Sequence, residues 1–209
     1  MISADTEARL HALIERDAWI PPAEWTAFVA AITERHACGL DHIVRQGRVA
    51  IWLSFVVDGV LRKYRVHDGS EVNIAFLTAG SFAGDYASCV SNTPSECGIQ
   101  AMRDSRLLGI RCAVMRAFAE RHQCWREFLV RAGARLYRNR ESRQADAQLR
   151  TPEWRYRRLV ARHPEVLRVV PHYHIASYLG ITPESFSRLL ARIHRGVQPP
   201  TAAGGAPGE

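Results

Sequence analysis

Side chains that can recognise a nucleic-acid base lie close together near the end of the chain. The segment from Thr182 to His194 places Arg188 and Arg192 one turn apart on a predicted helix. An arginine can form a bidentate pair with guanine, a glutamate can accept a hydrogen bond from cytosine, and a serine can donate or accept. The candidate base-reading and phosphate-binding residues here are Thr182, Glu184, Ser185, Arg188 and Arg192.

The same stretch has the signals of two helices joined by a tight turn. The first helix, HYHIASYL, is followed by Gly180, which suits the left-handed conformation that closes many helices. Thr182 is a favourable N-cap for the second helix, and Pro183 suits its first position. That second helix would bury one apolar stripe and expose its polar face. The stripe consists of Phe186, Leu189, Leu190 and Ile193.

Positive charge is concentrated in the same part of the chain. Residues 131–209 contain 14 arginines and 6 acidic residues, whereas residues 1–130 contain 14 basic and 15 acidic residues. This asymmetry favours a polyanionic partner such as double-stranded DNA. We therefore expect residues 150–196 to form an all-α helix-turn-helix DNA-binding domain. Further candidates for phosphate contacts are His172, His174, Arg155, Arg157, Arg158, Arg192 and Arg195.

The first part of the chain has the pattern of an antiparallel β-domain with flanking helices. From about Glu34 to Arg111, short runs rich in β-branched and aromatic residues alternate with turn signals. Asp58-Gly59 and Asp68-Gly69 each stand between two such runs, which predicts hairpins. The run VLRKYRV alternates in a way that predicts a strand buried on one face. We expect an antiparallel β-barrel or sandwich that serves as a sensor domain over residues 1–122.

A long helix is predicted over residues 123–149. Its apolar residues recur at helical spacing, and after Tyr137 the sequence becomes polar. A seam of this kind packs either on the β-domain or on a second copy of the chain, and both remain open. In the second case the helix would join two chains in a homodimer. The seam consists of Trp125, Phe128, Leu129, Ala132 and Leu136.

Composition and motifs argue against several other classes of protein. The chain is 47% hydrophobic and has no apolar run of membrane-spanning length, so we expect a cytoplasmic protein without a membrane partner. The five cysteines form no CxxC pair, and we expect no metal site or cofactor. No nucleophile-elbow, P-loop or dinucleotide motif occurs, so we expect no enzyme activity. Residues 197–209 are rich in Pro, Gly and Ala and are expected to be disordered.

In combination, these motifs resemble the Crp/Fnr superfamily of bacterial transcription regulators. The run VVDGVLRKYRVHDGSEVNIAFLTAGSFAGDY is similar to the hairpins and phosphate cassette of that family's cyclic-nucleotide-binding domain. HIASYLGITPESFSRLLARI is similar to its helix-turn-helix, in which Glu184 and Arg188 match two characteristic positions. The resemblance implies a jelly-roll barrel, a dimerisation helix and a recognition helix over residues 182–194. It also implies DNA, a second copy of the chain, RNA polymerase and a small-molecule effector as partners.

The sequence departs from the family pattern at the expected effector pocket and after the recognition helix. The resemblance places the pocket around Gly84, Asp85, Tyr86 and Ser95. The family's cyclic-nucleotide-binding members carry an arginine for the phosphate there, and none occurs between Gly84 and Ala101. We therefore expect an unknown effector that is not cyclic AMP. After Ile193 no strand is predicted, so we expect the family's β wing to be missing.

Two alternative functions remain. A degenerate regulator that acts through protein contacts, without specific DNA binding, would account for the altered pocket and the missing wing. A metal-binding barrel of the cupin kind would need converging His and Glu ligands. The one HxH pair, His172 and His174, lies outside the predicted barrel, and His36, His42 and His67 are singly spaced.

Overall fold

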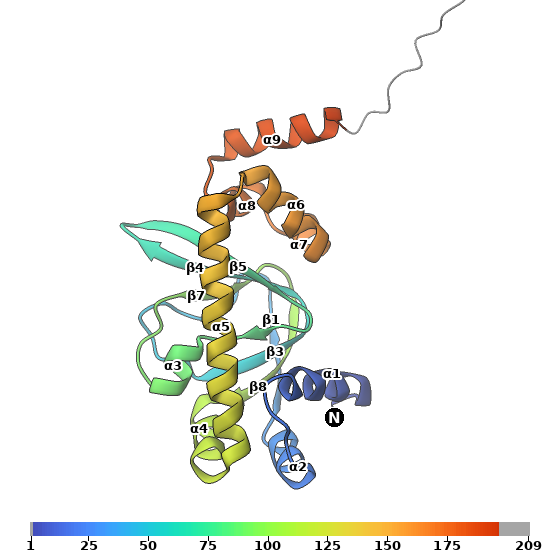
Figure 1. Cartoon of the computed structure of the whole chain (residues 1–209), viewed down its shortest axis with the longest axis vertical. Coiled ribbons are helices and arrows are strands. Elements are labelled where there is room, and N and C mark those ends of the chain that lie inside the picture. Colours follow the sequence, from blue (N-terminus) through green and yellow to red (C-terminus); the bar gives the residue numbers. More distant parts are fainter. Residues whose placement is uncertain (1, 197–209) are drawn as a thin grey trace, which may run out of the picture.

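The computed structural model describes residues 2–196, which form a β-domain with flanking helices, one long helix and a helical C-terminal part (Figure 1). The strands are β1 (Thr33–Ala37), β2 (His42–Val44), β3 (Trp52–Asp58), β4 (Val60–His67), β5 (Ser70–Thr78), β6 (Phe82–Ala83), β7 (Gly98–Ala101) and β8 (Ser105–Arg111). The helices are α1 (Ala4–Glu15), α2 (Pro22–Ala30), α3 (Tyr86–Ser91), α4 (Cys112–Arg121), α5 (Gln123–Leu149), α6 (Pro152–Arg162), α7 (Pro164–Val169), α8 (His172–Leu179) and α9 (Pro183–Gly196).

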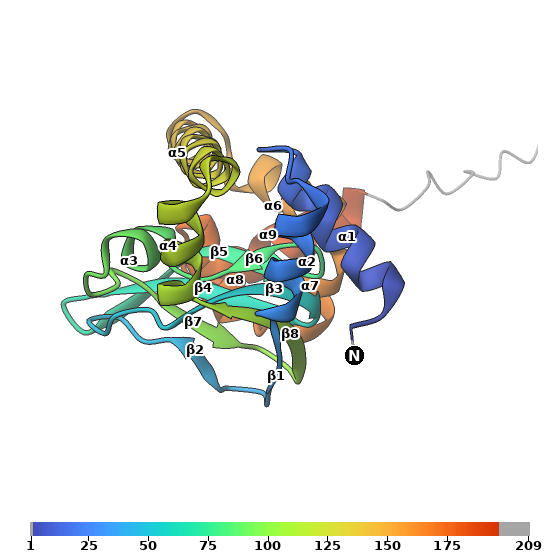
Figure 2. The ribbon, with the colours of Figure 1, turned by 90° about the horizontal axis from the view of Figure 1, so that it is seen from below.

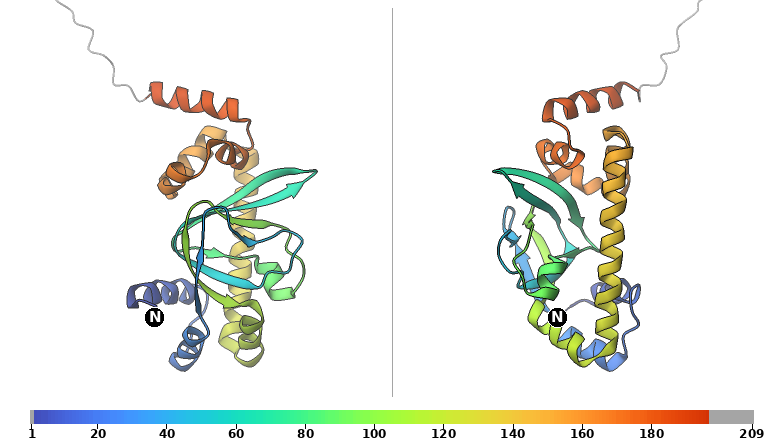
Figure 3. Two further views of the ribbon diagram at one scale, coloured as in Figure 1. Left: turned by 180° about the vertical axis from the view of Figure 1, so that it is seen from behind. Right: turned by 60° about the vertical axis from the view of Figure 1, so that its left-hand side comes forward.

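The strands form two antiparallel sheets of four strands, in the orders β1-β8-β3-β6 and β2-β7-β4-β5. The predicted antiparallel β-domain is thus confirmed, but the barrel is not closed in the described residues, where no named strand of one sheet pairs with a strand of the other. The edge strands β2 and β6 are only 3 and 2 residues long, too short to carry a ladder into the second sheet. The long β4–β5 hairpin extends beyond the rest of its sheet (Figure 3).

The two predicted Asp-Gly hairpins have different outcomes. At Asp68 and Gly69 the φ values are 49° and 75°, which suits the tight turn that joins β4 to β5. The hairpin predicted at Asp58-Gly59 is wrong, because β3 and β4 belong to different sheets. Gly59 has a φ of 141°, and a Cβ there would lie 2.2 Å from the Ser105 hydroxyl. Because Gly59 adopts this backbone conformation without a side chain, the chain can pass from one sheet to the other at this point.

The predicted seam of α5 packs on its own chain as far as Ala132, whereas its last residue, Leu136, is 42% exposed. Trp125 is fully buried and stacks on Phe28 of α2 with ring centroids 4.6 Å apart, and Phe128, Leu129 and Ala132 are buried in the same cluster. Further along, Arg135 binds the buried Asp17 carboxylate, with Nη2 2.6 Å from Oδ2. Figure 2 shows α5 almost end-on, running along one side of the β-domain. A second copy of the chain would have to use the opposite face of α5.

The prediction that β4 is buried on one face only is also wrong. In its first half both faces are buried: Leu61 lies between the sheets, and Arg62, on the outer face, is only 4% exposed. The outer face is covered because α8 packs on β5 and α7 packs on β4. The C-terminal helices thus contact the β-domain directly, through an apolar cluster that includes Val60, Phe76 and Ile175.

No helix within residues 2–196 is both long and apolar enough to span a bilayer. The disorder expected for residues 197–209 lies outside the described part of the chain, and so does most of the segment in which a wing was sought.

Candidate functional site

Helices α8 and α9 are joined by a short turn whose caps follow the sequence prediction. Gly180 closes α8 with a φ of 66°, in the left-handed region that glycine adopts without strain. The Thr182 hydroxyl accepts a hydrogen bond from the Ser185 backbone N–H at 3.2 Å, so Thr182 caps the start of α9 as expected. These local signals set where α9 begins and which of its faces packs inward.

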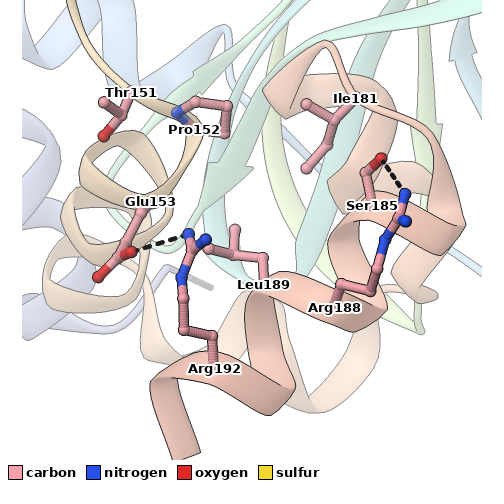
Figure 4. Close-up of a pocket in the computed structure, with 8 residues that line it drawn as sticks. All are labelled: Thr151, Pro152, Glu153, Ile181, Ser185, Arg188, Leu189 and Arg192. Atoms are coloured by element: carbon pink, nitrogen blue, oxygen red, sulfur yellow. Dashed lines mark hydrogen bonds and ion pairs between the residues drawn. The ribbon is translucent and has the colours of Figure 1, made fainter. Parts of the chain in front are cut away.

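The two faces of α9 are chemically distinct. Phe186 and Leu189 are buried against α8 and its neighbours, and Leu190 and Ile193 pack beside them. On the other side, Ser185, Arg188 and Arg192 line a hollow of about 390 Å³ between α9 and the start of α6 (Figure 4). Thr182, Glu184 and Ser187 are exposed along the same helix. The predicted polar face is therefore accessible to a partner.

The arginines of this face have different partners. Arg192 Nη2 lies 3.0 Å from Glu153 Oε2 (Figure 4). Arg157 binds the same carboxylate at 2.9 Å. Hydrogen bonds from Arg157 and Arg192 hold the pKa of Glu153 below its usual value. Arg188 instead donates to the Ser185 hydroxyl at 3.3 Å and has no acidic partner among the described residues. Arg188 is thus the side chain on α9 that is most ready to bind an external acceptor.

Glu184 is held at the start of α9. Hydrogen bonds from its own backbone N–H and from the Thr182 hydroxyl lower the pKa of Glu184, so it stays ionised near neutral pH. An ionised carboxylate only accepts hydrogen bonds, as reading a cytosine amino group requires. To accept from a base, this carboxylate would have to share or give up its contacts at the helix start.

The two histidines predicted to contact DNA are in different environments. His172 is exposed, and its ring packs edge-on against Phe186 with centroids 5.4 Å apart. His174 is only 7% exposed and lies against Asn73 and Arg62 of the β4–β5 hairpin. The prediction that His174 contacts a DNA phosphate is therefore corrected: α8 directs this side chain towards the β-domain.

The predicted effector pocket is occupied by the protein's own side chains. Asp85, 8% exposed, accepts hydrogen bonds from the Ser95 hydroxyl at 2.5 Å and from the Cys97 thiol at 3.5 Å. Burial alone would raise the pKa of Asp85, but the Ser95 and Cys97 hydrogen bonds and the charge of Lys63 lower it overall. A fixed carboxylate therefore lies in the segment where the family resemblance places the effector pocket.

The other two residues predicted for this pocket lie at its margins. Gly84 packs against β3, and a Cβ there would approach Leu53 to 3.0 Å. Tyr86 does not line the pocket as predicted, because its hydroxyl points to α5 and donates to the Leu129 carbonyl at 2.7 Å. A Cβ at Gly133 would lie 2.7 Å from that hydroxyl, so this glycine permits the close contact. Tyr86 links the pocket segment to the long helix.

Sequence reasoning missed three residues that these sites depend on. Glu153 holds two arginines beside α9. Arg62 and Asn73 are buried at the contact with α8. The one available signal was that Arg62 lies between Val60 and Tyr64 on one face of its strand. Among residues 2–196 no three His, Cys, Asp or Glu side chains converge as metal ligands would.

Comparison with protein families matches one part of the chain. The family model for the cyclic nucleotide-binding domain matches residues 34–122, which run from β1 to the end of α4. This segment therefore resembles domains that bind cyclic nucleotides. No protein with curated annotation is significantly similar to the chain.

Solved structures share the fold over most of the chain, at low sequence identity. FixK2 from Bradyrhizobium japonicum is 21% identical, with a TM-score of 0.64 over 82% of this chain and 89% of that one. A protein from Eubacterium rectale assigned to the Crp/Fnr family of transcriptional regulators is 18% identical, with a TM-score of 0.65 over 85% of each chain. The catabolite activator protein of Thermus thermophilus is 23% identical, with a TM-score of 0.51 over 85% of each chain. The similarity includes the C-terminal helices as well as the β-domain.

Proposed function

We propose that this protein is a DNA-binding transcription regulator of the Crp/Fnr type. The observation that carries the proposal is the division of α9, which buries Phe186 and Leu189, exposes Arg188 and Glu184, and leaves Ser185 half-buried beside them. A helix of this kind, preceded by a short helix and a tight turn, suits the major groove. The basic composition of residues 131–209 supports the same partner.

In the proposed complex, two chains pair along α5 and present their α9 helices to successive major grooves. A two-fold dimer requires a near-palindrome with half-sites about 34 Å apart. Arg188 reads a base edge, with Glu184 and Ser185 beside it. Arg192, released from or shared with Glu153, binds the phosphate backbone, and Arg155, Arg157 and Arg158 position the protein along it. RNA polymerase is a further proposed partner at promoters.

Selection of bound sequences from random double-stranded DNA tests this proposal. We expect enrichment of a near-palindrome, with affinity that falls steeply between low and moderate salt because phosphate contacts release counterions. Selection of a single half-site would contradict the dimeric arrangement. Failure to enrich any sequence would contradict DNA recognition and favour a regulator that acts through protein contacts.

The β-domain is proposed to respond to something other than a cyclic nucleotide. No arginine lies between Gly84 and Ala101 to pair with a cyclic phosphate, and the Asp85 carboxylate already accepts hydrogen bonds from Ser95 and Cys97. Calorimetric titration with cyclic AMP or cyclic GMP is expected to show no saturable binding, with any Kd weaker than about 1 mM. Saturable binding by the wild-type protein would contradict this prediction. If only the variant Asp85→Asn binds, the carboxylate is the group that excludes the nucleotide.

A further inference from the structure

A buried polar contact fastens the C-terminal helices to the β4–β5 hairpin. From β4, Arg62 Nη1 lies 3.4 Å from His174 Nδ1 of α8. From β5, the Asn73 side-chain NH₂ lies 3.1 Å from the same nitrogen and donates to the His174 carbonyl at 3.3 Å. The Asn73 backbone N–H donates to the Ser177 hydroxyl at 3.0 Å. We call Arg62, Asn73 and His174 the latch.

The chemistry of the latch requires one protonation state of His174. Asn73 must direct its NH₂ towards His174, because its oxygen accepts from Arg62 at 3.3 Å and its nitrogen binds the His174 carbonyl. Arg62 offers only N–H donors. His174 Nδ1 therefore faces two donors and has to accept, which a neutral ring does and a doubly protonated ring cannot.

Charge around the latch acts in the same direction. Arg62 is buried and balanced by Glu71 at 2.6 Å, and it also donates to Gln100 and stacks over Tyr64. A second positive charge on His174 would have no carboxylate left to balance it. Burial and the charge of Arg62 lower the pKa of His174 to about 4, despite the opposing effect of Glu71.

We propose that the latch is operated by a proton: it holds α8 on the β4–β5 hairpin while His174 is neutral and releases it when His174 is protonated. Release frees α9 to change its position relative to the β-domain, because α9 follows α8 after a short turn. The consequence for DNA binding rests on the proposed function, whereas the latch itself is tested without DNA. Two other histidines lie near this contact. His163 bonds Thr78 at 3.1 Å and lies near Glu165, and His42 bonds the hydroxyl of Tyr64, on which Arg62 stacks, at 3.0 Å.

The sign of the pH dependence follows from the two states. In the released state His174 has an ordinary pKa near 6.5, so between about pH 6.5 and pH 4 the released state binds a proton that the docked state does not. The latch is therefore closed above about pH 6.5 and weakens as the pH falls through that interval. The ratio of released to docked protein is expected to rise about 30-fold between pH 7.5 and pH 5.

Hydrogen exchange of the Asn73 backbone amide, followed by NMR in the full chain, reports the release directly, because this N–H is bonded across the contact to Ser177. After correction for the intrinsic rate, exchange should accelerate about 30-fold from pH 7.5 to pH 5. His174→Asn keeps an acceptor near the position of Nδ1 without titrating, and its corrected rate should stay constant. His172→Asn, on the same helix but exposed, should respond like the wild-type protein.

A second variant decides the matter if His174→Asn does not fold. Asn73→Asp places a carboxylate against the ring, so protonated His174 becomes the bonded form and exchange should slow, not accelerate, at pH 5. The latch would be overturned if exchange in Asn73→Asp accelerated at pH 5 as much as in the wild-type protein. It would also be overturned if exchange in His174→Asn depended on pH as it does in the wild-type protein. A normal latch in a protein that selects no DNA sequence would instead contradict the proposed function and leave the latch standing.

Discussion

Replacing Arg188 with alanine is expected to weaken binding to the selected operator by about 10- to 100-fold, or about 1–3 kcal/mol. Arg188 is exposed on α9, and its described partner is the neutral Ser185 hydroxyl, so no intramolecular ion pair has to break before it binds a base. A bidentate arginine contact carries sequence information, because only guanine offers O6 and N7 together in the major groove. The variant should therefore lose its base preference mainly at one base step of each half-site.

The control for this variant separates base reading from simple charge. Arg195 is exposed in the last turn of the same helix, and its side chain donates only to the Ala191 carbonyl. Arg195→Ala removes the same charge, and we expect a similar weakening on all sequences with an unchanged base preference. Fluorescence anisotropy on the operator, on its single-base variants and on scrambled DNA distinguishes a loss of base preference from a general loss of affinity. Wild-type affinity and preference in Arg188→Ala would rule out its role as a base reader.

Features encoded within a few residues were predictable from the sequence. Gly180 and Thr182 mark the end of α8 and the start of α9 because helix caps depend on backbone conformation and nearby N–H groups. The turn at Asp68 and Gly69 depends likewise on two adjacent residues with positive φ. The extent of α5 followed from helical spacing and from Thr151 at the start of the next helix.

Features that depend on which elements meet were not predictable in this way. Asp58-Gly59 carries the same dipeptide signal as the true hairpin, yet β3 pairs with β6 and β8 whereas β4 pairs with β5 and β7. Arg62 has the sequence signature of a solvated strand residue and is buried only because α8 covers it. His174 was assigned to DNA by its position in the chain, whereas the packing of α8 turns it to Asn73. Long-range contacts decided each of these cases.

The face of α5 available to a second chain also emerged only from the structure. The strongest apolar seam is already occupied by the protein's own helices α1 and α2 and by the β-domain. On the remaining face, Val130 and Tyr137 are 70% and 62% exposed and lie seven residues apart, with Ala134 between them. Residues at this spacing form one stripe along a helix. Two such stripes, packed together, would bury apolar side chains that the single chain leaves in water.

Val130→Asp is accordingly expected to convert the proposed dimer to monomer and to weaken operator binding by about 100-fold or more, since each half-site is then bound alone. A carboxylate on the stripe would lose its hydration and meet its counterpart near the two-fold axis, while the folded chain should be little affected because Val130 is exposed. Ala147→Asp, exposed on the same helix but off the stripe, adds the same charge and should remain dimeric. Sedimentation velocity and anisotropy measure both effects. A dimeric Val130→Asp protein with normal operator affinity would place the subunit contact elsewhere. A monomeric variant that still binds the full palindrome at wild-type strength would show that pairing along α5 is not what joins the two half-sites.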